Sequence, residues 1–174
     1  MAWRIEQLDK RTHDRESFTC GKPELDGYLK QIARKAAEID TGRTWVATDP
    51  ATSADATGKQ AIAGYYTVSM SSIDVSVIPT ARRNLPAQVP TALIGRLAVD
   101  QRHQRQGLGE FLLLDALRRI CQAAEHIAAH AIVVDAIDGD AKKFYEHYGF
   151  LELTDNPLHL FLPLASARGL FPAA

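Results

Sequence analysis

The spacing of apolar residues in the first half of the chain predicts one helix set among several strands. Between residues 23 and 39 apolar side chains recur at the spacing of one helical face, and Pro23 suits the first helical position. These apolar residues are Leu25, Leu29, Ile32, Ala36 and Ile39. Strand-like runs are Trp3–Leu8, Thr44–Thr48, Ala61–Met70 and Ser72–Ile78. Small polar residues at 49–60 predict a hairpin loop, and the proline-rich stretch Pro79–Pro90 predicts a surface crossing.

The second half of the chain shows strands alternating with helices. Thr91–Val99 and Ala131–Val134 are apolar runs typical of buried strands, the second of an interior parallel strand. A helix is predicted from Leu108 to about residue 125. Another runs from its N-cap Asp138 to Tyr148, with Gly149 in the left-handed conformation after it. Two short strands, Phe150–Leu153 and Leu158–Leu162, close the pattern. This order predicts an α/β fold with a parallel segment, in a single domain over residues 1–174.

Composition and charge narrow the class of protein. The 174 residues are 46% hydrophobic and 24% charged, which is the balance of a globular protein with a sizeable core. The net charge of −1 gives no global basic field that would attract nucleic acid. The two cysteines, Cys20 and Cys121, are too few for a disulfide framework or a zinc site, so a reduced cytoplasmic compartment and no metal are expected. Neither a signal peptide nor a membrane span is expected, because no sufficiently long apolar run occurs.

The clearest chemical pattern is the segment from Leu93 to Gly109, LIGRLAVDQRHQRQGLG. A strand leads into a turn rich in Arg and Gln, and Gly107 and Gly109 open a helix. The first turn of a helix presents unpaired backbone N–H groups and a partial positive charge, which together bind phosphate. Glycine lets a diphosphate approach the backbone, and Arg102 and Arg105 are placed to add charge-assisted hydrogen bonds.

Two other phosphate motifs do not fit this segment. A dinucleotide fingerprint would need a third glycine where Leu112 stands, and a P-loop would need a Gly-Lys-Ser or Gly-Lys-Thr that the chain lacks. On the two glycines alone, a tight turn without any ligand is an equally good interpretation.

Two motifs in the second half resemble one known superfamily. Gln104-x-x-Gly107-x-Gly109, after the strand that ends at Val99, resembles the acetyl-CoA motif of the GNAT superfamily of N-acetyltransferases. The later run AKKFYEHYGF, residues 141–150, resembles that superfamily's A-x-x-F-Y-x-x-x-G-F helix. The resemblance implies the GNAT fold: α/β, with a mixed central sheet of about six to seven strands that is splayed in the middle and has helices on both faces.

Further segments extend the resemblance to nearly the whole chain. They are FTCG at 18–21, LDGYL at 25–29, GYYTVS at 64–69, IGRLAVD at 94–100 and LFLPL at 160–164. All are similar to the acetyltransferase toxins of type II toxin–antitoxin modules. This subgroup resemblance implies acetylation of the α-amino group of an aminoacyl-tRNA, which blocks translation. It also implies a ribbon-helix-helix type antitoxin as partner, a cytoplasmic homodimer and no membrane partner.

The resemblance assigns residues to the cosubstrate acetyl-CoA. It places the backbone of Leu97, Ala98 and Val99 along the pantetheine arm, where an N–H group can polarise the thioester carbonyl. The remaining cofactor-binding residues that it implies are Gln104, Arg105, Gln106, Gly107, Leu108, Gly109, Glu110 and Phe144. Tyr145 matches the family tyrosine at the CoA sulfur and is the expected general acid. The enzyme need not supply a strong base. A free α-amine has a pKa near ~8, so a useful fraction of it is already neutral at cellular pH.

Neighbouring residues have plainer interpretations. Without the motif, Tyr145 would be read as a half-buried helix aromatic. Tyr148 is expected to pack against Phe144, one turn earlier, and His147 is expected at the surface. Cys20 precedes a helix start, which would lower a thiol pKa, but no partner motif accompanies it, so we expect a structural residue.

Basic residues around the first helix are candidates for binding the acceptor substrate. The candidates are Lys30, Arg34, Lys35, Arg43, Arg82 and Arg83, which together could form a rim for the phosphates of a tRNA acceptor stem. Equally open is a solvated polar face whose charges are balanced by Glu24, Asp26 and Glu38. Arg96, inside the buried strand, points either into the acceptor cleft or toward a partner in the core.

Two alternative functions remain open at this point. One is a GNAT acetyltransferase that acts on a small-molecule amine or on a peptide or protein N-terminus. The other is a non-catalytic module that binds acyl-CoA.

Overall fold

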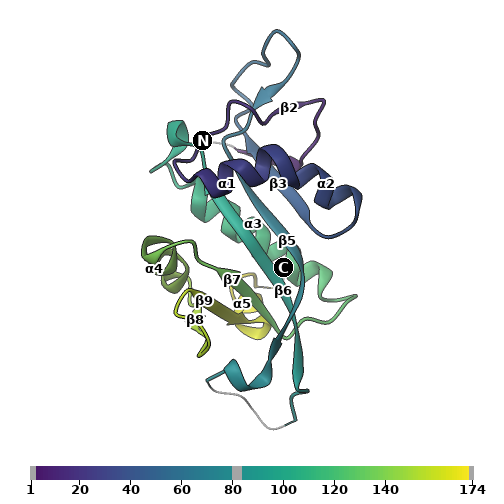
Figure 1. The fold of residues 1–174 in the computed structure, drawn as a ribbon, viewed down its shortest axis with the longest axis vertical. Coiled ribbons are helices and arrows are strands. Elements are labelled where there is room, and N and C mark those ends of the chain that lie inside the picture. The colour runs from purple at the N-terminus through teal and green to yellow at the C-terminus, as the bar shows by residue number, and fades with distance from the viewer. Residues whose placement is uncertain (1–2, 80–83, 173–174) are drawn as a thin grey trace. The chain divides into compact units, whose positions relative to one another are not determined.

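Figure 1 shows the fold of the computed structural model, which describes residues 3–79 and 84–172. The strands are β1 (Arg4–Gln7), β2 (His13–Asp14), β3 (Arg43–Thr48), β4 (Gln60–Ala61), β5 (Gly64–Asp74), β6 (Gln88–Val99), β7 (Ala131–Asp135), β8 (Leu151–Glu152) and β9 (His159–Pro163). The α-helices are α1 (Pro23–Gly27), α2 (Ala33–Glu38), α3 (Leu108–Ala123), α4 (Gly139–His147) and α5 (Leu164–Gly169). The described strands form a seven-stranded sheet in the order β1-β3-β5-β6-β7-β9-β8, and β2 pairs with β4. Because β6 and β7 are parallel while β7 and β9 are antiparallel, this is the predicted mixed α/β fold.

The chain divides into two compact units that exchange segments in sequence. The first unit holds the chain up to Ser69 together with Arg96–Asp115, and the second holds Met70–Gly95 together with the chain from Ala116 onward. Both β5 and β6 therefore contribute one end to each unit.

The first unit is built on an antiparallel arrangement of β1, β3 and β5. One buried apolar cluster of this unit is formed by Phe18, Cys20, Tyr28, Leu29, Ala33, Val46, Ile62, Tyr65 and Ala98. Tyr65 is fully buried, packs edge-on against the Phe18 ring and donates its hydroxyl hydrogen to the Leu25 carbonyl at 2.6 Å. The same side chain thus fills the core and fastens the first helical segment to the strand that carries it.

The predicted helix over residues 23–39 is interrupted by one wider turn. Residues 28–32 form a π-helical turn between α1 and α2. A π turn inserts an extra residue and rotates the following face, so the regular 3.6-residue spacing predicts the wrong side for part of the segment. Leu29, Ala33 and Ala36 are buried, whereas Ile32 and Ile39, which were expected on the apolar stripe, are 50% and 55% exposed. The expected apolar stripe is therefore wrong at these two isoleucines.

Two of the predicted strands are one element. Most of the runs Ala61–Met70 and Ser72–Ile78 lies in the single strand β5, Gly64–Asp74, whereas Ala61 belongs to β4 and Val75–Val77 form a short 3-10 turn. The turn begins at Asp74 because its side chain accepts a hydrogen bond from the Ser76 amide at 2.9 Å. Strand β6 starts at Gln88, so the proline-rich surface crossing ends earlier than predicted.

The second unit contains the parallel part of the sheet. Residues 91–94 of β6 pair in parallel with residues 131–134 of β7, and β9 pairs antiparallel with β7 and β8. One buried apolar cluster of this unit is formed by Ile78, Val89, Ala131, Val133, Leu153 and Phe161. The continuous apolar run of β7 is buried from Ala131 to Val134, as the sequence predicts for an interior strand. A last helix, α5, follows β9 and was not predicted.

Candidate active site

The turn after β6 is held by a buried carboxylate. Asp100 is fully buried and accepts hydrogen bonds from the Thr19 amide at 3.0 Å and the Arg102 amide at 2.9 Å. The Arg102 guanidinium completes the set through Nε at 2.8 Å and Nη2 at 3.1 Å. Burial alone would raise the pKa of the Asp100 carboxyl, but the hydrogen bonds from Arg102 and Thr19 outweigh it and hold that pKa below its ordinary value. Arg102 is thus engaged with Asp100, and its expected role as a phosphate ligand stays a prediction.

Gln104 joins the same turn to a distant segment. Its side-chain Nε2 donates to the Val99 carbonyl at 3.0 Å and to the Cys20 carbonyl at 3.1 Å. Arg105 and Gly107 both adopt positive φ, 62° and 80°, so the backbone reverses twice before the helix begins. Gln104 therefore shapes the turn through the backbone, and the side chains of Arg105 and Gln106 are left exposed.

The helix that follows begins where the motif predicts. Helix α3 starts at Leu108, and Phe111 is the first residue whose amide bonds back, to the Gly107 carbonyl at 3.1 Å. The preceding amides, at residues 108–110, have no acceptor within the helix by its geometry. Leu108 is buried, whereas Gly109 is half-buried and Glu110 exposed. Backbone donors of the predicted cofactor-binding residues thus gather at an exposed helix start, which suits a diphosphate.

A glycine packs β5 against this helix start. A Cβ on Gly64 would lie 2.8 Å from Leu112 Cδ1, 2.9 Å from the Ala98 carbonyl oxygen and 3.2 Å from Leu108 Cδ2. Only glycine allows strand β5 this close to the end of β6 and to α3. Sequence reasoning did not single out Gly64, although a glycine inside a strand pattern was the available signal.

The strand end expected along the pantetheine arm is partly covered. Ala98 is buried, and Leu97 and Val99 are half-buried. Arg96 lies with its guanidinium carbon 3.7 Å from the centroid of the Tyr28 ring, a cation–π contact within the first unit. This contact gives Arg96 a partner in the first unit, and its expected place in the acceptor cleft stays a prediction.

The predicted general acid lies in the second unit. Tyr145 is 5% exposed, and its ring packs edge-on against Phe144 and Phe150 with centroids 5.3 and 5.5 Å apart. Burial, with a smaller contribution from the negative charge of Asp135, raises the pKa of the Tyr145 phenol above its ordinary value. The phenol is therefore protonated throughout the neutral range.

Helix α4, which carries Tyr145, has the predicted ends. The Asp138 side chain accepts from the Ala141 amide at 2.9 Å as the N-cap, and Gly149 has φ of 97° directly after the last turn. Phe144 and Tyr148 pack edge-on with centroids 5.2 Å apart, as expected, and His147 is exposed. Asp135, at the end of β7, binds His159 Nε2 at 2.6 Å, and sequence reasoning missed this pair.

The basic candidates for substrate binding are only partly available. Arg34 pairs with Glu38 at 2.9 Å, as the solvated-face interpretation expects, and Arg43 pairs with Asp40. Lys35 is exposed and Lys30 half-buried. Arg82 and Arg83 lie outside the described residues.

Cys20 has the properties of a structural residue. Its side chain is buried and donates to the Lys22 carbonyl at 3.6 Å. Burial and the neighbouring Asp26 raise the pKa of the Cys20 thiol to about 11, the opposite of what a nucleophile requires. Within residues 3–79 and 84–172 no group of three His, Cys, Asp or Glu side chains could hold a metal ion. No helix in the same two stretches is long and apolar enough to cross a membrane.

Comparison with known protein families shows to which family this chain belongs. Residues 51–159 match the model described as "Acetyltransferase (GNAT) domain", a range that includes the turn after β6, the start of α3 and all of α4. The chain belongs to the GNAT acetyltransferase family. A tRNA-acetylating toxin from Mycobacterium tuberculosis is 39% identical over 158 residues, 90% of each chain. A probable toxin TacT from Sinorhizobium fredii is 34% identical over 176 residues, covering 95% of this chain and 93% of that protein.

Solved structures of KacT and AtaT agree with the fold along nearly the whole chain. A tyrosine-to-phenylalanine variant of KacT superposes with a TM-score of 0.88 at 27% identity, covering 98% of this chain and 100% of that one. AtaT in complex with acetyl-methionyl-tRNA superposes at 0.87 with 25% identity, over 98% and 100% of the two chains. A variant of AtaT bound to acetyl-CoA and the C-terminus of its antitoxin AtaR gives 0.82 at 25% identity, over 98% and 99%. The GNAT fold and acetyltransferase class predicted from the two motifs are thereby confirmed.

Proposed function

We propose that this acetyltransferase moves the acetyl group of acetyl-CoA to the α-amino group of an aminoacyl-tRNA and so acts as a translation-blocking toxin. The carrying observation is the 39% identity to a tRNA-acetylating toxin over 90% of both chains. Because the alignment covers 90% of both chains, the similarity extends over the whole acetyltransferase and not only over its cofactor-binding half.

The cosubstrate is proposed to bind along one continuous stretch of backbone. Amides at the start of α3, with those of Arg105 and Gly107, hold the diphosphate, because backbone donors gather at a helix N-terminus. The backbone of Leu97 to Val99 runs beside the pantetheine arm, where an amide polarises the thioester carbonyl. Asp100 and Gln104 position this stretch through their hydrogen bonds to the backbone.

Tyr145 is proposed to supply the proton for the leaving group. The neutral amine attacks the acetyl carbonyl carbon, the N–C bond forms and the C–S bond breaks. The sulfur takes the phenol proton of Tyr145, and the nitrogen that became positively charged on attack gives its extra proton to the tyrosine oxygen, which leaves a neutral amide. The raised pKa of Tyr145 keeps this proton in place until negative charge develops on the sulfur.

The test uses labelled acetyl-CoA with total charged tRNA, followed by identification of the acetylated aminoacyl-adenosine. We expect transfer by the wild-type protein and at least a hundred-fold slower transfer by Tyr145→Phe, within the range for a lost general acid. Tyr148→Phe is the matched control, because it removes a hydroxyl from the residue directly after α4 and keeps the ring that contacts Phe144. Full transfer by Tyr145→Phe would refute the catalytic role.

The same reaction separates the alternatives. Transfer to polyamines or peptide N-termini, with none to charged tRNA, would instead indicate a small-molecule or peptide acetyltransferase. Binding of acetyl-CoA without transfer to any amine would indicate a non-catalytic module.

The proposed partners follow from the same resemblance. A ribbon-helix-helix type antitoxin, a homodimer and a cytoplasmic location fit a toxin that acts on charged tRNA. The two units share the strands β5 and β6, which supports a single domain over residues 1–174. A small DNA-binding protein encoded beside this gene, and a dimeric mass in solution by light scattering, are the expected findings.

A further inference from the structure

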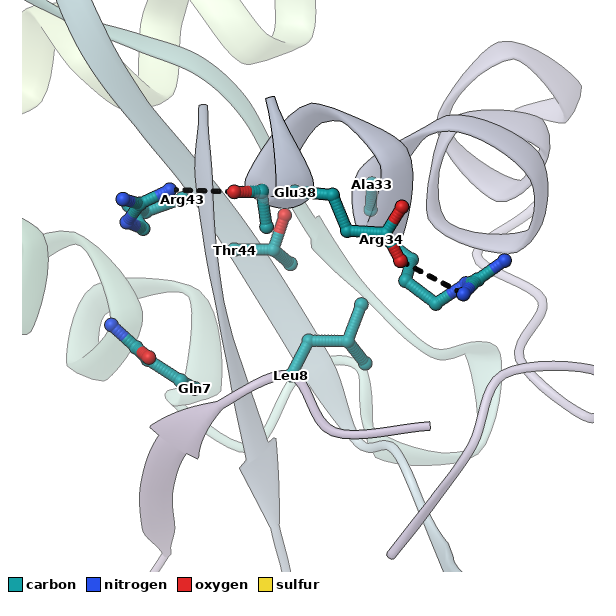
Figure 2. A pocket seen from close by; sticks show the side chains of 8 residues that line it. Gln7, Leu8, Ala33, Arg34, Glu38, Arg43 and Thr44 are labelled. Atoms are coloured by element: carbon teal, nitrogen blue, oxygen red, sulfur yellow. Dashed lines mark hydrogen bonds and ion pairs between the residues drawn. The ribbon is translucent and has the colours of Figure 1, made fainter. Parts of the chain in front are cut away.

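A hollow of about 250 Å³ lies in the first unit between α2 and the strands β1 and β3. Its lining residues are Gln7, Leu8, Ala33, Arg34, Ala37, Glu38, Arg43 and Thr44 (Figure 2). None of them belongs to the turn after β6 or to α4, so the hollow is separate from the residues assigned to acetyl transfer. Filled at the density of a protein interior, a hollow of this size holds on the order of ten non-hydrogen atoms.

One side chain in the hollow has an unmet hydrogen bond. Thr44 is 4% exposed, and its hydroxyl oxygen has no partner in the described part of the chain. Figure 2 shows this hydroxyl pointing from β3 toward α2. A buried hydroxyl without a partner costs free energy, so a polar atom beside Thr44 would stabilise the protein.

The hollow also offers hydrogen-bond donors that suit a carboxylate. Arg34 and Arg43 contribute two guanidinium groups, whose positive charges are balanced by Glu38 and Asp40. Arg34 donates to Glu38, and Arg43 donates through Nη1 to the Ala37 carbonyl and through Nη2 to Asp40 (Figure 2 draws the first two). Each guanidinium has five N–H donors, so both retain donors beyond these bonds.

Apolar atoms form the rest of the lining. Leu8 from the β1 end and Ala33 and Ala37 from α2 present methyl groups to the hollow. Such walls exclude a strongly hydrated ion and accept a short hydrocarbon body.

We propose that this hollow binds a short aliphatic carboxylate. The Thr44 hydroxyl donates to one carboxylate oxygen, a guanidinium of the lining holds the charge, and the hydrocarbon part lies against Leu8 and the two alanines. The site shares no residue with those assigned to acetyl-CoA or to proton transfer, whereas Arg34 and Arg43 are also candidates for binding the acceptor substrate.

The experiment titrates butyrate into the purified full-length protein, up to ~20 mM at constant ionic strength, because a ligand of this size binds in the millimolar range. Backbone amide shifts of Leu8, Ala37 and Thr44 in NMR spectra report on the hollow. We expect saturable shifts at these amides, and affinity at least tenfold weaker for butylamine, butyramide and inorganic phosphate.

Single variants of one strand give the matched comparison. Thr44→Val keeps the shape and removes the hydroxyl, so the affinity for butyrate should fall roughly ten- to hundred-fold, the range for losing a hydrogen bond to a charged group. Thr48→Val removes a hydroxyl that is equally buried and also lacks a described partner, but does not line the hollow, so binding should be unchanged. Thr44→Ser retains the hydroxyl and should bind butyrate.

Three results would overturn the proposal. Amide shifts that do not saturate with butyrate in the wild-type protein would mean that the hollow does not bind it. Equal affinity for phosphate or butylamine would remove the carboxylate class. Undiminished binding by Thr44→Val would remove the role of the hydroxyl.

Discussion

The buried carboxylate of Asp100 offers the sharpest test of how the turn after β6 is held. It accepts from the amides of Thr19 and Arg102 and from Nε and Nη2 of the Arg102 guanidinium. Replacing Asp100 with alanine removes all of these hydrogen bonds at once. It also removes the tie between the turn and residue 19, which is far away in sequence.

The expected loss follows from these contacts. A hydrogen bond to a charged group contributes about 1.5–3 kcal/mol, but Thr19 and Arg102 are exposed, so their freed N–H groups regain water. We therefore expect Asp100→Ala to lower the free energy of unfolding by about 2–4 kcal/mol. The variant should still fold, since domains of this size have about 5–15 kcal/mol. Its acetyl-CoA affinity should fall about tenfold, because the loosened turn must be ordered on binding.

Urea unfolding followed by circular dichroism measures the first effect, and calorimetric titration with acetyl-CoA measures the second. Asp55→Ala is the control: Asp55 also accepts from two backbone amides, those of Thr57 and Lys59, but is exposed in a loop and should have a much smaller effect. Equal losses for the two variants, or unchanged acetyl-CoA affinity in Asp100→Ala, would refute the reasoning.

The pH dependence of stability gives an independent reading of the same carboxylate. The pKa of Asp100 lies below its ordinary value of 3.8 in the folded protein, so the unfolded chain takes up the proton first as pH falls. Asp100 therefore contributes fully to the free energy of unfolding above its ordinary pKa of 3.8. This contribution is lost as pH falls through the lower pKa that Asp100 has in the folded protein. The stability difference between wild type and Asp100→Asn should therefore narrow below about pH 4.

Three further predictions concern packing, thiol reactivity and substrate binding. Gly64→Ala should destabilise by about 1–3 kcal/mol in urea, because its Cβ would meet the Ala98 carbonyl oxygen at 2.9 Å, whereas Gly27→Ala, with no atom within 4 Å, should be neutral or slightly stabilising. Cys20 should resist maleimide labelling at pH 8 in the native protein and react only after urea is added, since its pKa of about 11 leaves ~0.1% thiolate; rapid native labelling would contradict this. Lys35→Gln should reduce the salt dependence of tRNA binding by about 0.7–0.9 in log–log slope, and Lys59→Gln should not; equal slopes would place Lys35 outside the tRNA interface.

Local signals predicted the elements around the candidate site well. The sequence correctly predicted the strand that ends at Val99, the helix that starts at Leu108 and the N-cap Asp138. Each depends on residues only a few positions apart, a glycine turn or a side chain that caps its own helix, so no tertiary information is required.

The features that the sequence did not predict depend on irregular helix geometry or on contacts between distant segments. The π turn at residues 28–32 leaves no trace in an apolar spacing that reads as regular, and it exposes Ile32 while Ala33 is buried. The role of Asp100 depends on Thr19, 81 positions away. Its bond to the Arg102 amide, two residues on, is a local turn signal that could have identified it.

Tyr145 shows where sequence and structure contribute different things. The motif identifies the residue and the helix, but motif letters carry no information about its protonation. That depends on Phe144 and Phe150 enclosing the ring and on the charge of Asp135 from another strand. Both effects oppose ionisation, so the phenol proposed as the general acid stays neutral over the whole range in which a substrate amine titrates. The proposed mechanism therefore predicts that the amine, and not Tyr145, determines how the rate responds to pH near neutrality.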